Sequence, residues 1–93
     1  MLNIAKYQKV EAIQELQTDY EMMIAMLDAE INLNRERIKH VQERMKLKKS
    51  ADIKVAGYLR LMKFNKAIHL AEMKRLTYLH YQDGLSDKLK ELK

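Results

Sequence analysis

The sequence contains no cysteine, no proline and no tryptophan, and it has only two glycines. Without cysteine the chain cannot form disulfides or thiolate metal sites, which fits a reducing compartment. Proline, the strongest helix breaker, is missing, and most residues are Ala, Leu, Lys, Glu, Met, Gln, Ile or Arg, which favour helices. The composition therefore predicts an all-α protein.

Long apolar runs and catalytic motifs are absent as well. The longest apolar run, Met22 to Leu27, is far shorter than the ~20 residues that cross a bilayer. Lys6 and Lys9 interrupt the N-terminal region, so we expect no signal peptide. Ser50 and Ser86 are the only serines, and no Ser/His/Asp set or phosphate-binding glycine loop is present. We expect a cytoplasmic, non-enzymatic protein that needs no cofactor and contacts no membrane.

The chain length limits the hydrophobic core. At 93 residues we expect a single helical domain over residues 1–93, whose core is only modestly stabilising by itself. Association with a second copy would add buried surface. The sequence therefore predicts a homo-oligomer, in the form of a dimeric helical bundle.

In the first half of the chain, apolar residues recur at every third or fourth position, as on one face of a helix. The predicted stripe consists of Ile13, Leu16, Tyr20, Met23, Leu27, Ile31, Asn34, Ile38, Val41 and Met45. Thr18, with Glu21 three positions later, has the form of a capping box and would divide this arm into two helices. The stripe passes Thr18 without losing phase, which favours one unbroken helix.

The stretch from Lys46 to Asp52 lies near the midpoint, and we interpret it as the bend of an antiparallel hairpin. Ser50 can cap the second long helix, and Asp52 lies in the first turn, where a carboxylate favours the helix dipole. A reversal at Ser50 sets residue i opposite residue 101 − i. If the chain continues straight, the alternative is one long rod that pairs with a second copy.

The second helix is predicted to span Ala51 to Asp83, because Gly84 suits the left-handed position that follows a helix. Ser86 then caps a short C-terminal helix, which is stable only when docked. The apolar residues of the second helix cover more than one face, which predicts more than one neighbouring helix. They include Ile53, Val55, Tyr58, Leu59, Leu61, Met62, Phe64, Ile68, Leu70, Ala71, Met73, Leu76 and Leu79.

Positive charge is concentrated around the predicted bend. The net charge is −4 over residues 1–34, +8 over residues 35–66 and +1 over residues 67–93. A basic end on a helical rod attracts a phosphate backbone, and it also attracts an acidic protein surface. Solvated charge runs without a partner are common too. The candidate nucleic-acid contacts are Arg44, Lys46, Lys48, Lys49 and Lys54.

Two further groups are candidate surfaces for a partner protein. One is an apolar row opposite the main stripe of the first arm, formed by Met22, Met26, Ala29 and Leu33. Methionine side chains adapt readily to partners, although cover by another helix is the commoner reason for such a row. The other group is Tyr78 and Tyr81, for which packing against the first arm is the simpler explanation.

Polar residues are also predicted inside the apolar stripes. Asn34 lies on the stripe of the first arm, and Asn65, His69 and Glu72 lie on the apolar side of the second. The reversal at Ser50 would bring all four together. A buried polar layer of this kind fixes register in coiled coils. His69 and Glu72 have the i, i+3 spacing of bundle metal ligands, but one pair per chain is a thin ligand set, and we expect no metal site.

Two functional hypotheses remain open. The first is a small regulator whose basic bend contacts nucleic acid. The second is a protein-binding modulator, such as an inhibitor, scaffold or assembly factor, that docks through Met22, Met26, Leu33, Tyr78 and Tyr81.

Overall fold

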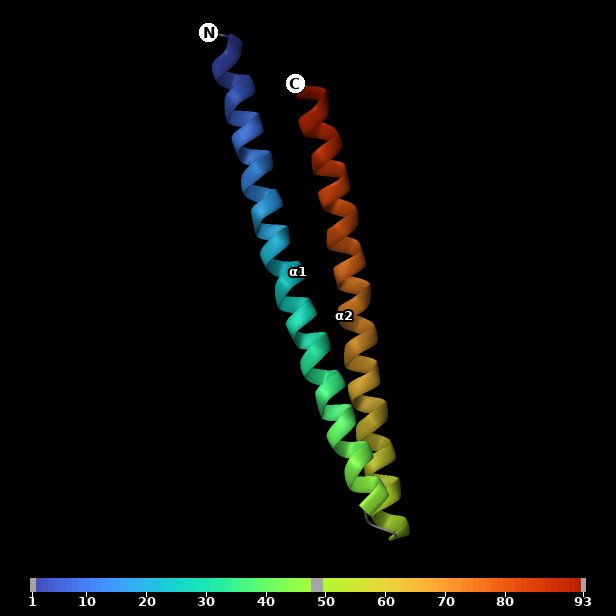
Figure 1. Ribbon diagram of the computed structural model, residues 1–93. Coiled ribbons are helices and arrows are strands. Elements are labelled where there is room, and N and C mark those ends of the chain that lie inside the picture. The colour runs from blue at the N-terminus through green and yellow to red at the C-terminus, as the bar shows by residue number, and fades with distance from the viewer. Residues whose placement is uncertain (1, 48–49, 93) are drawn as a thin grey trace.

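The protein is a helical hairpin (Figure 1), seen in a computed structural model that describes residues 2–47 and 50–92. Helix α1 spans Leu2–Leu47 and helix α2 spans Ala51–Leu92. Both termini lie at the same end of a rod that measures 74 × 14 × 13 Å. The described residues contain no strand. The predicted all-α hairpin is confirmed.

Helix α1 is continuous over 46 residues, so the alternative with a break at Thr18 is wrong. Thr18 does not act as the N-cap of a new helix. Its hydroxyl donates a hydrogen bond of 3.1 Å to the carbonyl oxygen of Gln14, one turn earlier. Within a helix this is the ordinary local partner for a threonine hydroxyl, which leaves the helical backbone intact.

The chain reverses between Leu47 and Ala51, within the predicted bend. The backbone N–H of Lys54 donates to the carbonyl oxygen of Ser50 at 3.1 Å, which makes Ser50 the N-cap residue of α2. Asp52 lies in the first turn of α2, as predicted. Lys48 and Lys49 lie outside the described residues.

Helix α2 continues to Leu92, so the prediction of a helix end at Asp83 and a separate short C-terminal helix is wrong. Gly84 adopts no positive φ and lies within the helix. Contacts with α1 explain the continuation, because they outweigh the local signals for a stop. The Gln17 side chain donates to the Ser86 hydroxyl at 3.2 Å, and the Gln82 side chain donates to the Gln17 carbonyl oxygen at 3.1 Å.

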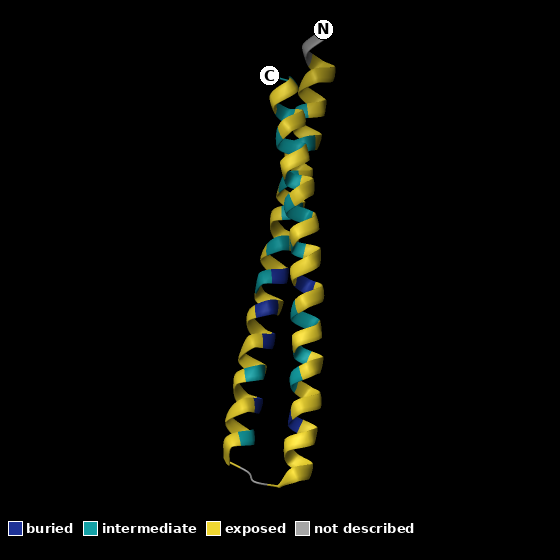
Figure 2. Cartoon of the chain, turned by 90° about the vertical axis from the view of Figure 1, so that its right-hand side faces the viewer, coloured by how far each residue is buried: buried dark blue, intermediate teal, exposed yellow. Residues whose placement is uncertain are grey.

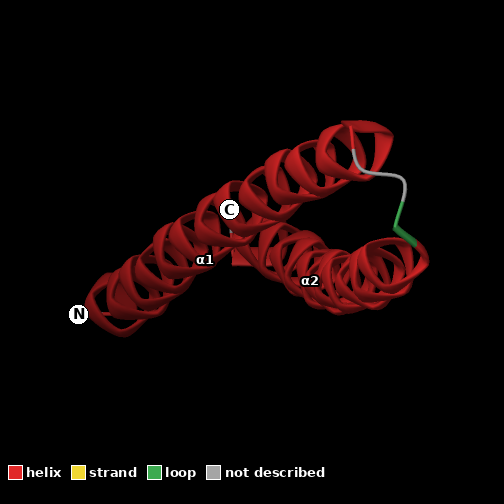
Figure 3. Cartoon of the chain, turned by 90° about the horizontal axis from the view of Figure 1, so that it is seen from below, coloured by secondary structure: helices red, strands yellow, loops and turns green. Residues whose placement is uncertain are grey.

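The two helices meet along a seam with the seven-residue repeat of a coiled coil. In α1 the seam contains Val10, Ile13, Gln17, Tyr20, Ile24, Leu27, Ile31, Asn34, Ile38, Val41 and Met45, and in α2 it contains Gly57, Leu61, Phe64, Ile68, Ala71, Arg75, Tyr78, Gln82, Leu85, Leu89 and Leu92. Seen along the rod, the helices cross at a slant (Figure 3). Such a crossing keeps a 3.5-residue repeat in contact.

The predicted stripe of α1 was wrong at two positions. Leu16 and Met23 are 45% and 38% exposed, and Gln17 and Ile24 take their places in the seam. Between Ile13 and Tyr20, a series through Leu16 has steps of three and four residues, and a series through Gln17 has steps of four and three. Both series fit one face of a helix. Adjacent residues on a helix point about 100° apart, so only the position of α2 decides which series faces inward.

The core is thin. The buried apolar residues among those described are Leu27, Ile31, Val41 and Ala71, and no large side chain there is fully buried. Figure 2 shows the buried positions, in dark blue, only where the helices face each other. Neither described helix combines the length and apolar character needed to cross a membrane.

Replacement of Gly84 by alanine tests the continuity of α2. Gly84→Ala is expected to raise the free energy of unfolding by about 0.5–1 kcal/mol, because alanine has the higher helix propensity. A Cβ at Gly84 would meet nothing within 4 Å. Thermal denaturation followed by circular dichroism measures the change. Lower stability would indicate that the helix ends at Asp83.

Gly57→Ala is the matched control. A Cβ at Gly57 would lie 2.7 Å from Cγ and Sδ of Met45 on α1. The Met45 side chain would have to move, and overpacking of this kind costs about 1–3 kcal/mol. Gly57→Ala is therefore expected to be the less stable of the two variants.

Candidate functional site

A groove lined by arginines runs along one flank of the hairpin, next to the bend. It consists of two adjoining cavities of about 280 and 170 Å³ that share Val41, Arg44 and Arg60. We call it the arginine groove; its residues are Arg37, His40, Val41, Arg44, Met45, Ile53, Ala56, Gly57, Arg60 and Phe64. No acidic residue is among them.

The heptad seam explains why the three arginines meet. Arg37 and Arg44 are seven residues apart on α1, so both lie on the same side of the seam. Arg60 comes from α2, which the reversal of the chain places alongside. The guanidinium carbon of Arg37 lies 5.9 Å from the centre of the Phe64 ring, within the range of a cation–π contact. The groove thus joins three cations to an apolar floor.

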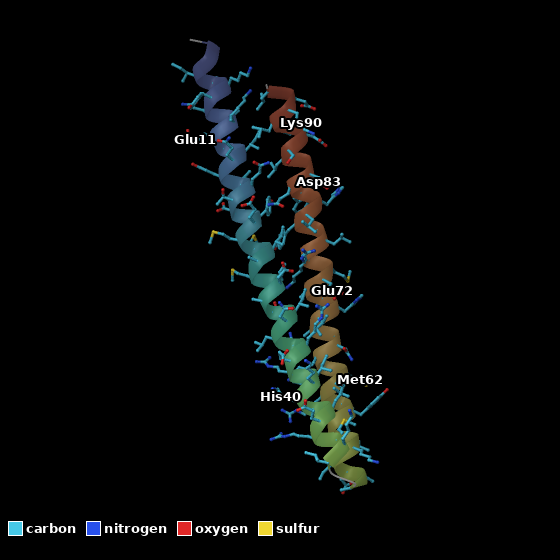
Figure 4. The ribbon with its side chains drawn as sticks, in the orientation of Figure 1. Glu11, His40, Met62, Glu72, Asp83 and Lys90 are labelled. Carbon is cyan, nitrogen blue, oxygen red and sulfur yellow. The ribbon has the colours of Figure 1, made fainter. Side chains whose placement is uncertain are left out.

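The opposite flank carries the ion pairs found among the described residues. Arg75 Nε lies 2.6 Å from Asp28 Oδ1, and Arg35 Nη2 lies 3.5 Å from Glu72 Oε1. All four side chains are substantially exposed, so each pair contributes modestly to stability. Figure 4 shows Glu72 near the middle of α2, and His40 closer to the bend. Charge is therefore balanced on this flank and uncompensated in the arginine groove.

Three of the predicted nucleic-acid contacts, Arg44, Lys46 and Lys54, are among the described residues. Arg44 lines the arginine groove, Lys46 lies in the last turn of α1 and Lys54 in the first turn of α2. Lys48 and Lys49 lie outside the described residues. The prediction missed Arg37 and Arg60. Their signal was the spacing of seven from Arg37 to Arg44, together with the reversal that sets Arg60 opposite Val41.

The predicted protein-docking residues divide into two groups. Met22, Met26 and Leu33 are 61%, 71% and 51% exposed, on the face of α1 that points away from α2. Tyr78 is half-buried, and its ring centre lies 5.6 Å from that of Tyr20. Tyr81 completes this cluster at 5.7 Å from Tyr20 but remains 49% exposed. Tyr78 therefore packs the arms together, whereas the methionine row is free in the hairpin.

Of the four residues of the predicted polar layer, only Asn34 is buried within the hairpin. Asn34 is 4% exposed, whereas Asn65, His69 and Glu72 are exposed and Glu72 pairs with Arg35. The prediction of four buried polar groups was wrong because Asn65 and Glu72 lie beside the seam and His69 lies on the side of α2 turned away from α1. Among the described residues, no group of three or more His, Asp or Glu side chains is arranged to hold a metal ion.

Comparison with protein-family models, curated protein sequences and solved structures finds no match for the chain.

Asn34 offers a test of the seam. Its Oδ1 accepts only a long bond of 3.5 Å, from Arg37 Nη1, in a nearly water-free position. Asn34→Leu is therefore expected to raise the free energy of unfolding by on the order of 1 kcal/mol. Thermal denaturation measures the change. Exposed Asn32→Leu is the control, with an expected effect within about 0.5 kcal/mol. A loss of stability in Asn34→Leu would show that the polar contact favours folding.

Proposed function

We propose that the protein is a small, non-enzymatic cytoplasmic regulator that binds the phosphate backbone of nucleic acid through its basic end. The observation that carries the proposal is the arginine groove, where Arg37, Arg44 and Arg60 meet without an acidic residue in the lining. Lys46 and Lys54 extend the positive surface to the bend. A bound polyanion would relieve the repulsion among these cations.

The chemistry of arginine supports phosphate as the ligand. The planar guanidinium donates paired hydrogen bonds that match phosphate oxygens, which lysine cannot do. The net charge of +8 over residues 35–66 adds long-range attraction to a polyanion. Apolar groove residues such as Val41 and Phe64 offer contact to sugar or base.

Charge reversal at the bend tests the proposal. The combination of Arg44→Glu, Lys46→Glu and Lys54→Glu is expected to weaken binding of a labelled DNA or RNA oligonucleotide at least ~100-fold, because three phosphate contacts become repulsive. Fluorescence anisotropy measures the affinity. The wild-type affinity should fall steeply as salt is raised, since binding releases counterions.

The matched control reverses three charges at the far end of the rod, with Lys6→Glu, Lys9→Glu and Lys88→Glu. All three lysines are exposed. The change in net charge is the same, so a much smaller loss of affinity is expected. Equal losses in both triple variants would show that the bend has no special role, and no loss in either would contradict the proposal.

A second candidate function is docking to another protein through the methionine row of α1. It is favoured by the exposure of Met22, Met26 and Leu33, which is unusual for three neighbouring large apolar residues. Met22→Glu with Met26→Glu is expected to change the free energy of unfolding by less than about 0.5 kcal/mol while abolishing binding of such a partner. Unfolding of the variant would show instead that the row belongs to a core.

We also propose that the hairpin works as a homodimer. Only four apolar residues of the described chain are buried in the single hairpin. Small helical domains commonly obtain further burial by association. A dimer would present two basic ends to a polyanion.

A further inference from the structure

Helix α2 carries a second heptad row on the side turned away from α1. Successive members are four and three residues apart in alternation, which is the spacing of a coiled-coil seam. We call this row the outer seam; it consists of Val55, Leu59, Met62, Lys66, His69, Met73, Leu76 and His80, all exposed. Its five apolar members are 54–70% exposed. The hairpin by itself therefore leaves one full seam of α2 uncovered.

We propose that the outer seam binds the outer seam of a second copy in antiparallel orientation. The pattern is self-complementary about a midpoint between Ala67 and Ile68. In that register Leu59 lies opposite Leu76 of the other copy, and Met62 opposite Met73. The polar members Lys66 and His69 then meet each other at the centre. This inference rests on the proposed homodimer and is independent of nucleic-acid binding.

The register also sets the extent of the match. Val55, at one end of the outer seam, lies opposite His80 of the second copy, so the apolar pairs are Leu59 with Leu76 and Met62 with Met73. Beside the seam, Tyr58, which is 61% exposed, lies two residues from the level of half-buried Leu79 of the second copy. Asn65 likewise lies two residues from the level of Glu72, close to the polar centre.

The surface area of the chain leaves room for such an interface. The hairpin exposes 7771 Å², whereas a compact protein of its mass would expose about 5,700 Å². A standard interface buries about 800 Å² on each partner. The excess of the rod is larger than this, so the hairpin has enough exposed surface for an interface of standard size along α2.

Charge favours the antiparallel arrangement. A parallel dimer would place two basic ends side by side, each with a net charge of +8 over residues 35–66. The antiparallel dimer separates them by about 55 Å, at ~1.5 Å for each residue between the bend and the midpoint. Each basic end then lies beside the rest of the other copy, where residues 1–34 carry a net charge of −4.

Substitutions that pair across the proposed interface test the register. Leu59→Glu is expected to raise the dimer dissociation constant at least about tenfold, measured by sedimentation or light scattering. Adding Leu76→Lys is expected to restore association, because each introduced glutamate then faces an introduced lysine. Leu59→Glu with Leu76→Glu is expected to stay monomeric. Equal behaviour of the two double variants would overturn the register.

The control for the face is Met26→Glu, which introduces the same charge on the outer face of α1 at a residue that is 71% exposed. It should leave the dimer intact, and circular dichroism should show full helicity in every variant. Dissociation caused by Met26→Glu, with none caused by Leu59→Glu, would assign the interface to α1. A monomeric wild-type protein would overturn the inference and leave the outer seam to a different protein.

The orientation can be measured directly because the chain has no cysteine. A spin label on Asp52→Cys, at the start of α2, should show a distance between copies of about 45 Å in the antiparallel dimer, from ~1.5 Å per residue to the midpoint. A parallel dimer would bring the two labels to within about 20 Å, roughly two helix diameters. The short distance would overturn the proposed orientation.

Discussion

The whole hairpin depends on a single contact surface, the seam between α1 and α2. A rod 74 Å long and only 14 by 13 Å across holds two helices side by side and nothing more. Each helix can therefore cover one side of the other, and half of every helix remains in solvent. This geometry explains why so few side chains are buried, and why small details such as the close approach of Met45 to Gly57 matter.

The reversal of the chain sorts the charges of the two arms onto different flanks. Because the helices are antiparallel, positions that precede the seam residues in both helices lie on one side, and positions that follow them lie on the other. One side gathers three arginines, and the other pairs Asp28 with Arg75 and Arg35 with Glu72. The reversal thereby places three arginines next to one another in a protein of modest net charge.

The same narrow seam leaves large apolar surfaces in solvent. Helix α2 exposes its outer seam, and α1 exposes the row around Met26. A monomeric protein rarely keeps apolar rows of this length uncovered. The proposed self-association through α2 and the proposed anion binding near the bend use different faces of the rod. The two proposals are therefore compatible in one molecule.

The sequence alone determined the helical content and the second apolar row of α1, because these follow from local propensity and periodicity. It indicated a reversal near Ser50 but left one straight rod as the alternative, and the structure decided between them. Tertiary structure alone decided which residues face inward. Gln17 lies in the seam and Leu16 does not. Both spacings fit a helix equally well, so only the position of α2 decides between them. Helix α2 continues beyond Gly84, although Gly84 and Ser86 favour a helix end there, because Gln82 and Ser86 form hydrogen bonds with α1. The arginine groove needs Arg37 and Arg60 side by side, and no local pattern specifies a meeting of residues from different arms.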